Sequence, residues 1–477
     1  MAKILPNLPI DKLTKENDYI GILTKGDIIK NFFLSHKHDF NRVKFFALYG
    51  EWGSGKSSLM KYLEEELKGS FNAFFFEAWE YESDHNLPKS LLEFLHYKSG
   101  TKVDDVFKNG TKLLEGFARS ITFKTPIFNI NSNKIIESVE ENSFFELKQR
   151  FKEDFESWEN KITECDKCPK YNIVFIDDLD RCEPENVLNL LSAIKLFFTY
   201  GKKTIFLCGI DKKAVDEAVK TKYKDVIKAN EYLEKVFDLT FSMPKENSIE
   251  QLISYYFDGN YTDSNGQKVN LPKHIANFFW ILKFENPRRI KKILNKYKLI
   301  ESLRENLFIG YDLPDLIMKK GGTLFETILT LYLLILKEFE PSIFNDFLNL
   351  SLKKEIINRS LYKVDLMTDA LNSKGAFSEY PKLKEYNFDI DINMTAFANR
   401  DKEFKLSHLI FLFFPNNITS VGNAAFDSFE DFQLYTHVNE KKIDYYFVEY
   451  LFRFPVFQQD TYTYSFLDYK RMIINLI

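Results

Sequence analysis

A short run near the start of the chain has the spacing of a phosphate-binding loop. Residues 50–57 read G-E-W-G-S-G-K-S, which fits G-x-x-x-x-G-K-[ST]. The glycines permit a tight turn whose N–H groups point at phosphate oxygens, and the N-terminus of the helix that follows favours the same anion. Lys56 can reach the β- and γ-phosphates, Ser57 can ligate Mg²⁺, and Ser58 can lie near the α-phosphate. We therefore predict that Mg²⁺ and ATP bind here, held by Gly50, Glu51, Trp52, Gly53, Ser54, Gly55, Lys56, Ser57 and Ser58.

A second run supplies the carboxylates that such a site needs. Residues 173–178 read I-V-F-I-D-D, so an apolar strand ends in a pair of acids. Ligands bind at the carboxyl ends of parallel strands, which is where these acids emerge. We predict that Asp177 holds Mg²⁺ with Ser57, through water, and that Asp178 orients or activates the attacking water. Without the phosphate loop, the same acids would indicate only a turn after a strand.

Further charged residues have both a catalytic and a structural interpretation. Asp211 follows an apolar strand, where it could sense the γ-phosphate or cap the helix that begins after it. Arg181 could pair with the neighbouring acids or reach the nucleotide of an adjacent subunit. Arg288 could report closure of a helical lid, or it could belong to a basic solvated face. The predicted catalytic set is Lys56, Asp178, Asp211 and Arg288.

The elements that must position these residues form an α/β pattern. Apolar runs alternate with helical periodicity, which predicts a parallel sheet with helices on both faces. The predicted strands cover residues 43–49, 71–78, 172–177, 204–209 and 239–243. A helix over residues 56–67 follows the phosphate loop.

The rest of the chain is mainly helical in pattern. A polar insertion over residues 88–170 contains helical spacing at 143–161, and helices are predicted at 248–257, 272–284 and 287–300. We predict a P-loop NTPase core over 1–244 that includes the helical insertion, a helical lid over 245–311, and a mostly helical C-terminal domain over 312–477.

Composition narrows the class of protein. The chain has 477 residues and a net charge of −4, so charge alone does not favour nucleic-acid binding, although the basic stretch 287–300 keeps that partner possible. The mainly apolar run at 327–336 is only ten residues long, which is too short for a membrane span, and no signal peptide is visible. With only four cysteines we expect a cytoplasmic protein. The C-x-x-C of Cys165 and Cys168 lacks the second pair that a zinc ribbon needs.

Together, these segments resemble the KAP family of P-loop NTPases. The loop containing Trp52, and I-D-D-L-D-R-C at residues 176–182, are similar to the family's phosphate loop and its DDLDRC signature. Supporting similarities lie at residues 76–81, 208–211, 232–237, 241–244 and 286–291. Glu77 and Glu80 stand where the family usually has Asn and Arg. Many members carry inserted transmembrane helices, whereas the insertion here is polar.

The resemblance implies a fold of the additional-strand class, related to AAA+ and STAND ATPases. It also implies ATP hydrolysis that drives a conformational or assembly switch, with a role in bacterial antiviral (phage) defence. We expect a homo-oligomer and partner proteins encoded nearby. The alternatives are an ATP-dependent DNA- or RNA-binding motor or clamp, and a nucleotide-binding scaffold that does not hydrolyse ATP.

Overall fold

The computed structural model describes residues 4–84, 86–100, 110–115, 144–164, 167–223, 229–244, 249–262, 268–307, 324–348 and 441–454. The chain divides into two compact units. The first is Leu8–Ser248, and the second combines Met1–Asn7 with Ile249–Ile477. The division into core, lid and C-terminal domain stays a prediction.

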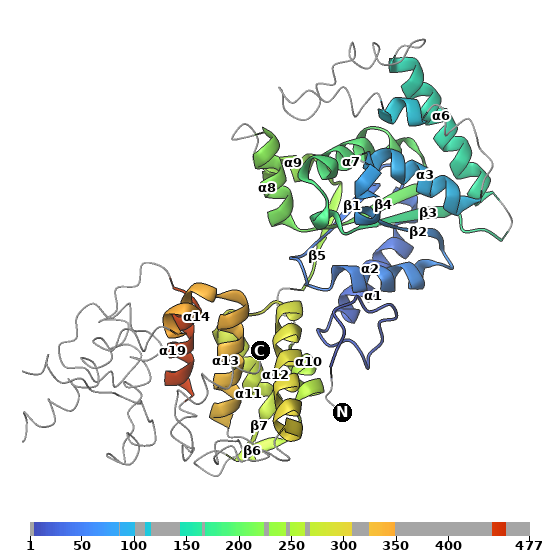
Figure 1. Ribbon diagram of the computed structural model, residues 1–477. Helices are drawn as coiled ribbons and strands as arrows, with labels where there is room; N and C mark the ends of the chain where they lie inside the picture. Colours follow the sequence, from blue (N-terminus) through green and yellow to red (C-terminus); the bar gives the residue numbers. More distant parts are fainter. Residues whose placement is uncertain are drawn as a thin grey trace, which may run out of the picture. The chain divides into compact units, whose positions relative to one another are not determined.

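The first unit is built on a five-stranded sheet (Figure 1). Its strands are β1 (Phe45–Tyr49), β2 (Phe71–Glu77), β3 (Tyr171–Asp177), β4 (Thr204–Ile210) and β5 (Leu239–Ser242). Every neighbouring pair is parallel, and the order is β2-β3-β4-β1-β5. The predicted α/β parallel-sheet fold is confirmed, and β4 is the additional strand between β1 and β3.

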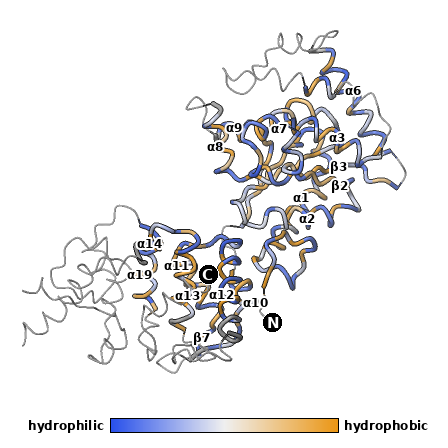
Figure 2. The backbone as a smooth tube through the Cα atoms, viewed as in Figure 1, coloured by the Kyte–Doolittle hydropathy of each residue, from blue (hydrophilic) through white to orange (hydrophobic). Residues whose placement is uncertain are grey.

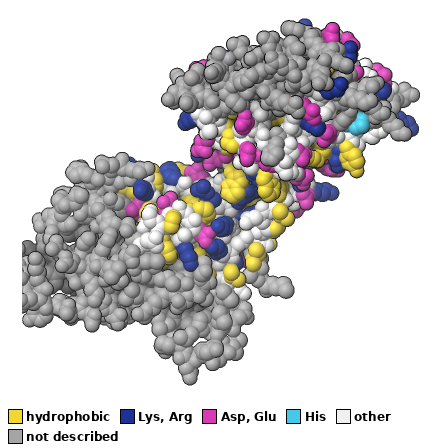
Figure 3. All heavy atoms as spheres, turned by 45° about the horizontal axis from the view of Figure 1, so that its top comes forward, with side chains coloured by type: hydrophobic (Ala, Val, Ile, Leu, Met, Phe, Trp, Pro, Cys, Tyr) yellow, Lys and Arg dark blue, Asp and Glu magenta, His cyan; other side chains and the backbone are white. Residues whose placement is uncertain are grey.

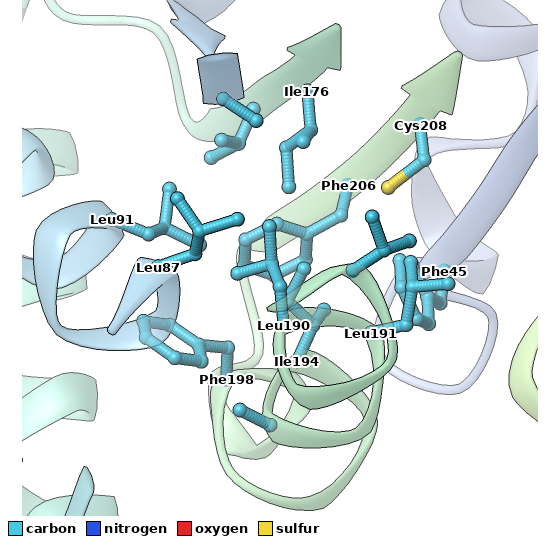
Figure 4. Close-up of a cluster of buried hydrophobic side chains, with 14 of the residues drawn as sticks. Phe45, Leu87, Leu91, Ile176, Leu190, Leu191, Ile194, Phe198, Phe206 and Cys208 are labelled. Atoms are coloured by element: carbon cyan, nitrogen blue, oxygen red, sulfur yellow. The ribbon is translucent and has the colours of Figure 1, made fainter. Parts of the chain in front are cut away.

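Helices cover both faces of this sheet. One face packs against α1 (Leu23–Ser35) and α2 (Lys56–Leu67), together with the 3-10 turn η1 (Lys37–Asp39). The other face carries α3 (Leu87–Ser99), α6 (Phe144–Thr163), α7 (Pro184–Leu196), α8 (Lys212–Tyr223) and α9 (Ala229–Val236). Leucines of α3 and α7 pack against Phe206 of β4 (Figure 4). Each large apolar side chain buried in this way contributes roughly 1.5–3 kcal/mol, which fixes the strand ends that carry the acids.

Short 3-10 turns follow several of these elements. They are η2 (Ala78–Asp84) after β2, η3 (Leu179–Arg181) after β3, and η4 (Phe198–Tyr200) after α7. The predicted helix at 143–161 corresponds to α6, whose apolar residues Phe151, Phe155 and Trp158 are buried. The helices carry both hydrophobic and hydrophilic stretches, as amphipathic helices do (Figure 2).

The described part of the second unit is mainly helical. It contains α10 (Ile249–Tyr256), α11 (Leu271–Ile281), α12 (Pro287–Leu307), α13 (Leu324–Phe339), α14 (Pro341–Leu348) and α19 (Ile443–Arg453). The predicted helices at 248–257, 272–284 and 287–300 are therefore present. An antiparallel hairpin of β6 (Asn260–Thr262) and β7 (Lys268–Asn270) was not predicted, because three-residue strands are too short to show alternation.

The C-terminal helices of this unit pack through aromatic rings. The Tyr332 ring of α13 stacks on Phe447 of α19 with centroids 3.7 Å apart. His274 of α11 lies 2.7 Å from the Tyr450 hydroxyl, and burial lowers the pKa of His274 to about 4. Residues 312–323, 349–440 and 455–477 of the predicted C-terminal domain lie outside the described residues.

Candidate nucleotide-binding site

The predicted phosphate loop joins β1 to α2. Its start is fixed where Gly50 N–H donates to Ile210 O at 3.0 Å, and it turns where Ser54 N–H donates to Glu51 O at 3.1 Å. Gly53 and Gly55 have φ of 82° and 95°, a left-handed conformation that glycine adopts without a Cβ penalty. The sequence pattern therefore has a direct geometric cause.

Two features inside the loop fit a phosphate group. A methyl group added at Gly50 would lie 2.5 Å from Ser54 Oγ, so the backbone passes closely around that hydroxyl. Ser54 is buried, and among the described residues its Oγ has no hydrogen-bond partner. Because a buried hydroxyl normally finds a partner, this atom fits hydrogen bonding to an oxygen of a bound phosphate.

Lys56 is held inside the loop. Its side chain is only 7% exposed, and Nζ donates to Gly50 O at 2.9 Å and to Glu51 O at 3.1 Å. Asp180 Oδ2 lies 4.0 Å from the same nitrogen. Burial raises the pKa of Asp180, Lys56 opposes this rise, and Asp177 and Asp211 add to it. The lysine charge therefore sits between backbone carbonyls and a carboxylate.

Asp177 lies at the carboxyl end of β3 and is 3% exposed. A methyl group added at Gly209 of β4 would lie 2.9 Å from Asp177 Oδ1 and 3.1 Å from Met60 Sδ. The Asp177 carboxylate therefore lies over β4, beside the P-loop helix α2. Ser57, the other predicted magnesium ligand, is half-buried in the first turn of α2.

Asp178 follows with φ of 58° and is the residue immediately before η3. Its Oδ1 lies 3.2 Å from Arg181 Nε, and the Arg181 guanidinium carbon lies 5.1 Å from the centre of the Trp79 ring. The within-chain ion pair considered for Arg181 is thus present. A contact with an adjacent subunit stays a prediction.

The turn after β2 is tied to the turn after β3. Glu82 Oε1 accepts hydrogen bonds from Glu183 N–H at 2.6 Å and from Asn186 Nδ2 at 3.0 Å. Glu77 pairs in register with Asp177. These contacts place the segment at residues 76–81 beside the acidic run.

Asp211 connects the phosphate loop to α8. Its Oδ2 accepts the Trp52 N–H at 2.8 Å, and its Oδ1 accepts the Lys213 N–H at 3.0 Å. The Lys213 ammonium also pairs with Glu51 Oε1 at 2.6 Å. Asp211 therefore caps α8, as one of the two interpretations predicted, and it also holds the phosphate loop through the Trp52 N–H. A role in sensing the γ-phosphate stays a prediction.

Arg288 belongs to the second unit, at the start of α12, so it is not among the residues that the first unit brings together. Its predicted role in a lid is an expectation that rests on family resemblance and residue type.

Several lysines of α12 already contact acidic or carbonyl groups of the second unit. Lys292 Nζ lies 2.5 Å from Glu338 of α13, and Lys296 pairs with the same carboxylate. Lys291 Nζ donates to Pro6 O at 2.5 Å, and burial lowers the pKa of Lys291. On the face in view, acidic and basic side chains of the described residues are intermixed (Figure 3). These pairings leave less positive charge available for nucleic acid than the sequence suggests.

The N-terminal segment was missed by sequence reasoning. Ile10 N–H donates to Ser58 Oγ at 2.9 Å, so the serine predicted near the α-phosphate is already in contact with this segment. Ile20 packs against Gly55. No motif marked these residues, because their part in the site comes from long-range packing.

Other predicted features take no part in the described site. Cys168 is in a disulfide, whereas Cys182 and Cys208 are free and buried. Cys165 lies outside the described residues. Within the described ranges, no group of His, Cys, Asp and Glu has the arrangement of a metal site. No helix in that part of the chain is long and apolar enough to cross a membrane.

Comparison with known proteins agrees with this geometry. The sequence matches the KAP family P-loop domain over residues 36–304. This chain belongs to the KAP family. The predicted family resemblance is confirmed, and a P-loop NTPase domain is present.

Relatives and solved structures give further similarities. The uncharacterized protein MJ0182 of Methanocaldococcus jannaschii is 33% identical over 170 residues, covering 28% of this chain and 88% of that protein. The uncharacterized protein MJ0181 of the same organism is 34% identical over 114 residues, covering 22% of this chain and 44% of that protein. The structure of the Aeropyrum pernix ORC2 protein aligns with a TM-score of 0.32 and 11% identity, over 64% of this chain and 66% of that one.

Proposed function

We propose that this KAP family protein binds Mg²⁺–ATP in the loop Gly50–Ser57 and hydrolyses it. The observation that carries the proposal is the arrangement at one edge of the sheet. The loop after β1 holds Lys56 and a buried serine hydroxyl, and the neighbouring strands β4 and β3 end beside it in acids. A phosphate cradle next to carboxylates is the arrangement that metal-assisted phosphoryl transfer uses.

Each residue has a task that follows from its position. Ser57 and Asp177 would hold the metal ion, which supplies charge neutralisation to the phosphates when bound. Lys56 would exchange its bonds to Gly50 O and Glu51 O for phosphate oxygens, so its charge is already in place. Asp178 would orient the attacking water and accept its proton, after its carboxylate is released from Arg181.

The replacement of Asp178 by Asn tests whether this carboxylate takes part in ATP hydrolysis. The amide keeps the size of the side chain but cannot take a proton, so we expect ATP binding to persist while single-turnover hydrolysis falls about 100-fold or more. Glu217→Gln is the matched control, because Glu217 is an exposed acid on α8. Hydrolysis by Asp178→Asn at the wild-type rate would remove Asp178 from the mechanism.

We further propose that turnover drives a conformational or assembly switch, in a homo-oligomer with partner proteins encoded nearby, and that the switch serves bacterial antiviral defence. Membership of the KAP family supports this proposal. The test is phage plating on a bacterial host that carries the protein with its neighbouring genes. We expect protection with wild type and its loss with Lys56→Ala. Equal plating with and without the wild-type genes would reject the defence role.

A further inference from the structure

The two flanks of the phosphate loop differ in chemical character. In the sheet order, β4 and β3 lie on one side of β1, and β5 lies on the other. The β4 and β3 side brings Asp211 and Asp177 to the loop. On the opposite side, the residue after β5 is Met243, which is 6% exposed and donates its N–H to Tyr49 O at 2.7 Å. The loop is thus acidic on one flank and apolar on the other.

Three apolar side chains form the second flank. A methyl group added at Gly55 would lie 2.8 Å from Ile20 Cδ1, 3.4 Å from Ile22 Cδ1 and 3.7 Å from Met243 Cε. Met243 also reaches the start of the loop, where a methyl group at Gly50 would lie 2.6 Å from its Cγ. Ile22 is fully covered, whereas Ile20 is only half-buried. Ile20 is therefore the member of this flank that a ligand can touch.

The segment that carries Ile20 contacts the P-loop helix and is ordered by its own hydrogen bonds. Ile10 N–H donates to Ser58 Oγ at 2.9 Å, and Asp11 pairs with Lys61 of α2 at 3.0 Å. The buried carboxylate of Asp18 accepts the N–H groups of Ile22 and Leu23 at 2.9 and 2.8 Å. The first two contacts place the start of this segment beside the first turns of α2, and the Asp18 bonds order the residues around Ile20.

A nucleoside triphosphate has one charged end and one largely apolar end, which match the acidic and the apolar flank of the loop. Its phosphates match the acidic flank, because the Mg²⁺ that Ser57 and Asp177 would hold would offset the negative charge of the phosphates and the carboxylates. Its flat base is largely apolar and is stabilised by contact with aliphatic side chains. On the basis of the proposed ATP binding, we propose that the nucleoside lies on the side of β5 and residues 8–22, with its base packed against Ile20.

Competition binding separates contacts to the base from contacts to the phosphates. A fluorescent ATP analogue is displaced from the full-length protein either by ATP or by inorganic tripolyphosphate, which has the phosphates but no base. Ile20→Ala removes the aliphatic contact, so we expect ATP to bind about tenfold more weakly, while tripolyphosphate binds as it does to wild type. Leu8→Ala is the matched control, because Leu8 belongs to the same segment and is 74% exposed.

The possible results are distinct. Unchanged ATP affinity in Ile20→Ala would place the base elsewhere and overturn the inference. An equal loss for ATP and tripolyphosphate would also overturn it, since Ile20 would then only support the loop at Gly55. Binding of tripolyphosphate by wild type with no preference for ATP would reject a base contact but leave the phosphate cradle standing. Failure of wild type to bind either compound would reject the proposed function itself.

Discussion

A methyl group at Gly209 should weaken magnesium binding without touching the nucleotide. Gly209 lies within buried β4, and the added Cβ would be 2.9 Å from Asp177 Oδ1 and 3.1 Å from Met60 Sδ. Separations this short force a neighbour to move. The Met60 side chain is flexible and can give way, whereas Asp177 can do so only by shifting its carboxylate or the end of β3. Gly209→Ala is therefore directed at the predicted metal ligand.

The size of the effect follows from the cost of overpacking. An extra methyl group in a close-packed interior costs typically about 1–3 kcal/mol. If that cost falls on the position that Asp177 needs for binding the metal, Mg²⁺ affinity in the presence of ATP drops by about 5-fold to about 150-fold. Any part of the cost that falls on the fold instead appears as a lower free energy of unfolding.

The assay is a titration of Mg²⁺ into protein with ATP, followed by single-turnover hydrolysis, with urea unfolding measured on the same samples. Gly69→Ala is the control, because a methyl group there meets no atom within 4 Å. ATP binding in the presence of EDTA should be close to wild type, which shows that the phosphate loop is intact. A normal Mg²⁺ requirement in a folded but destabilised Gly209→Ala protein would refute the placement of the metal at Asp177.

Two further predictions concern side chains that join separate elements. Asp211→Ala removes the acceptor for Trp52 N–H and Lys213 N–H, so the free energy of unfolding in urea should fall by about 1 kcal/mol. Asp211→Asn should largely restore it, and equal losses in both variants would contradict the capping role. Burial lowers the pKa of His274 from 6.5 to about 4, so the unfolded state binds more protons between these values and the free energy of unfolding should fall as pH drops from 6.5 towards 4. His274→Gln should reduce this slope in denaturant titrations across that pH range, and an unchanged slope would show that His274 is not its source.

The strands of the sheet, the phosphate loop and the acids after β3 could be predicted because each is encoded by a short local sequence pattern. Four apolar residues before Asp177 indicate a buried strand, and the spacing of the glycines around Lys56 requires the turn that the structure shows. Strand order is not local information. The family resemblance implied only a fold of the additional-strand class, which the position of β4 between β1 and β3 bears out, and the full strand order was not predicted.

What the sequence did not reveal depends on contacts between distant residues. Ile20 lies against the phosphate loop only because the segment before α1 packs beside Gly55. The tie between Asp211 and the Trp52 N–H joins a side chain to a backbone group far away in the chain, which no periodicity encodes. The sequence of α12 indicates a solvated basic face, but Lys292 and Lys296 pair with Glu338 of α13. In each case the missing information is tertiary packing rather than residue type.

The central claim is that the Lys56 ammonium and the loop around it bind ATP for hydrolysis. Steady-state ATP turnover of wild type and Lys56→Ala, each shown to be folded by circular dichroism and urea unfolding, tests it most directly. The account predicts Mg²⁺-dependent release of phosphate by wild type, and a loss of about 100-fold or more in the variant, because removal of a charge-stabilising group at transferring phosphates is worth several kcal/mol. Equal turnover by the two proteins, or none by wild type with Mg²⁺ present, would contradict it.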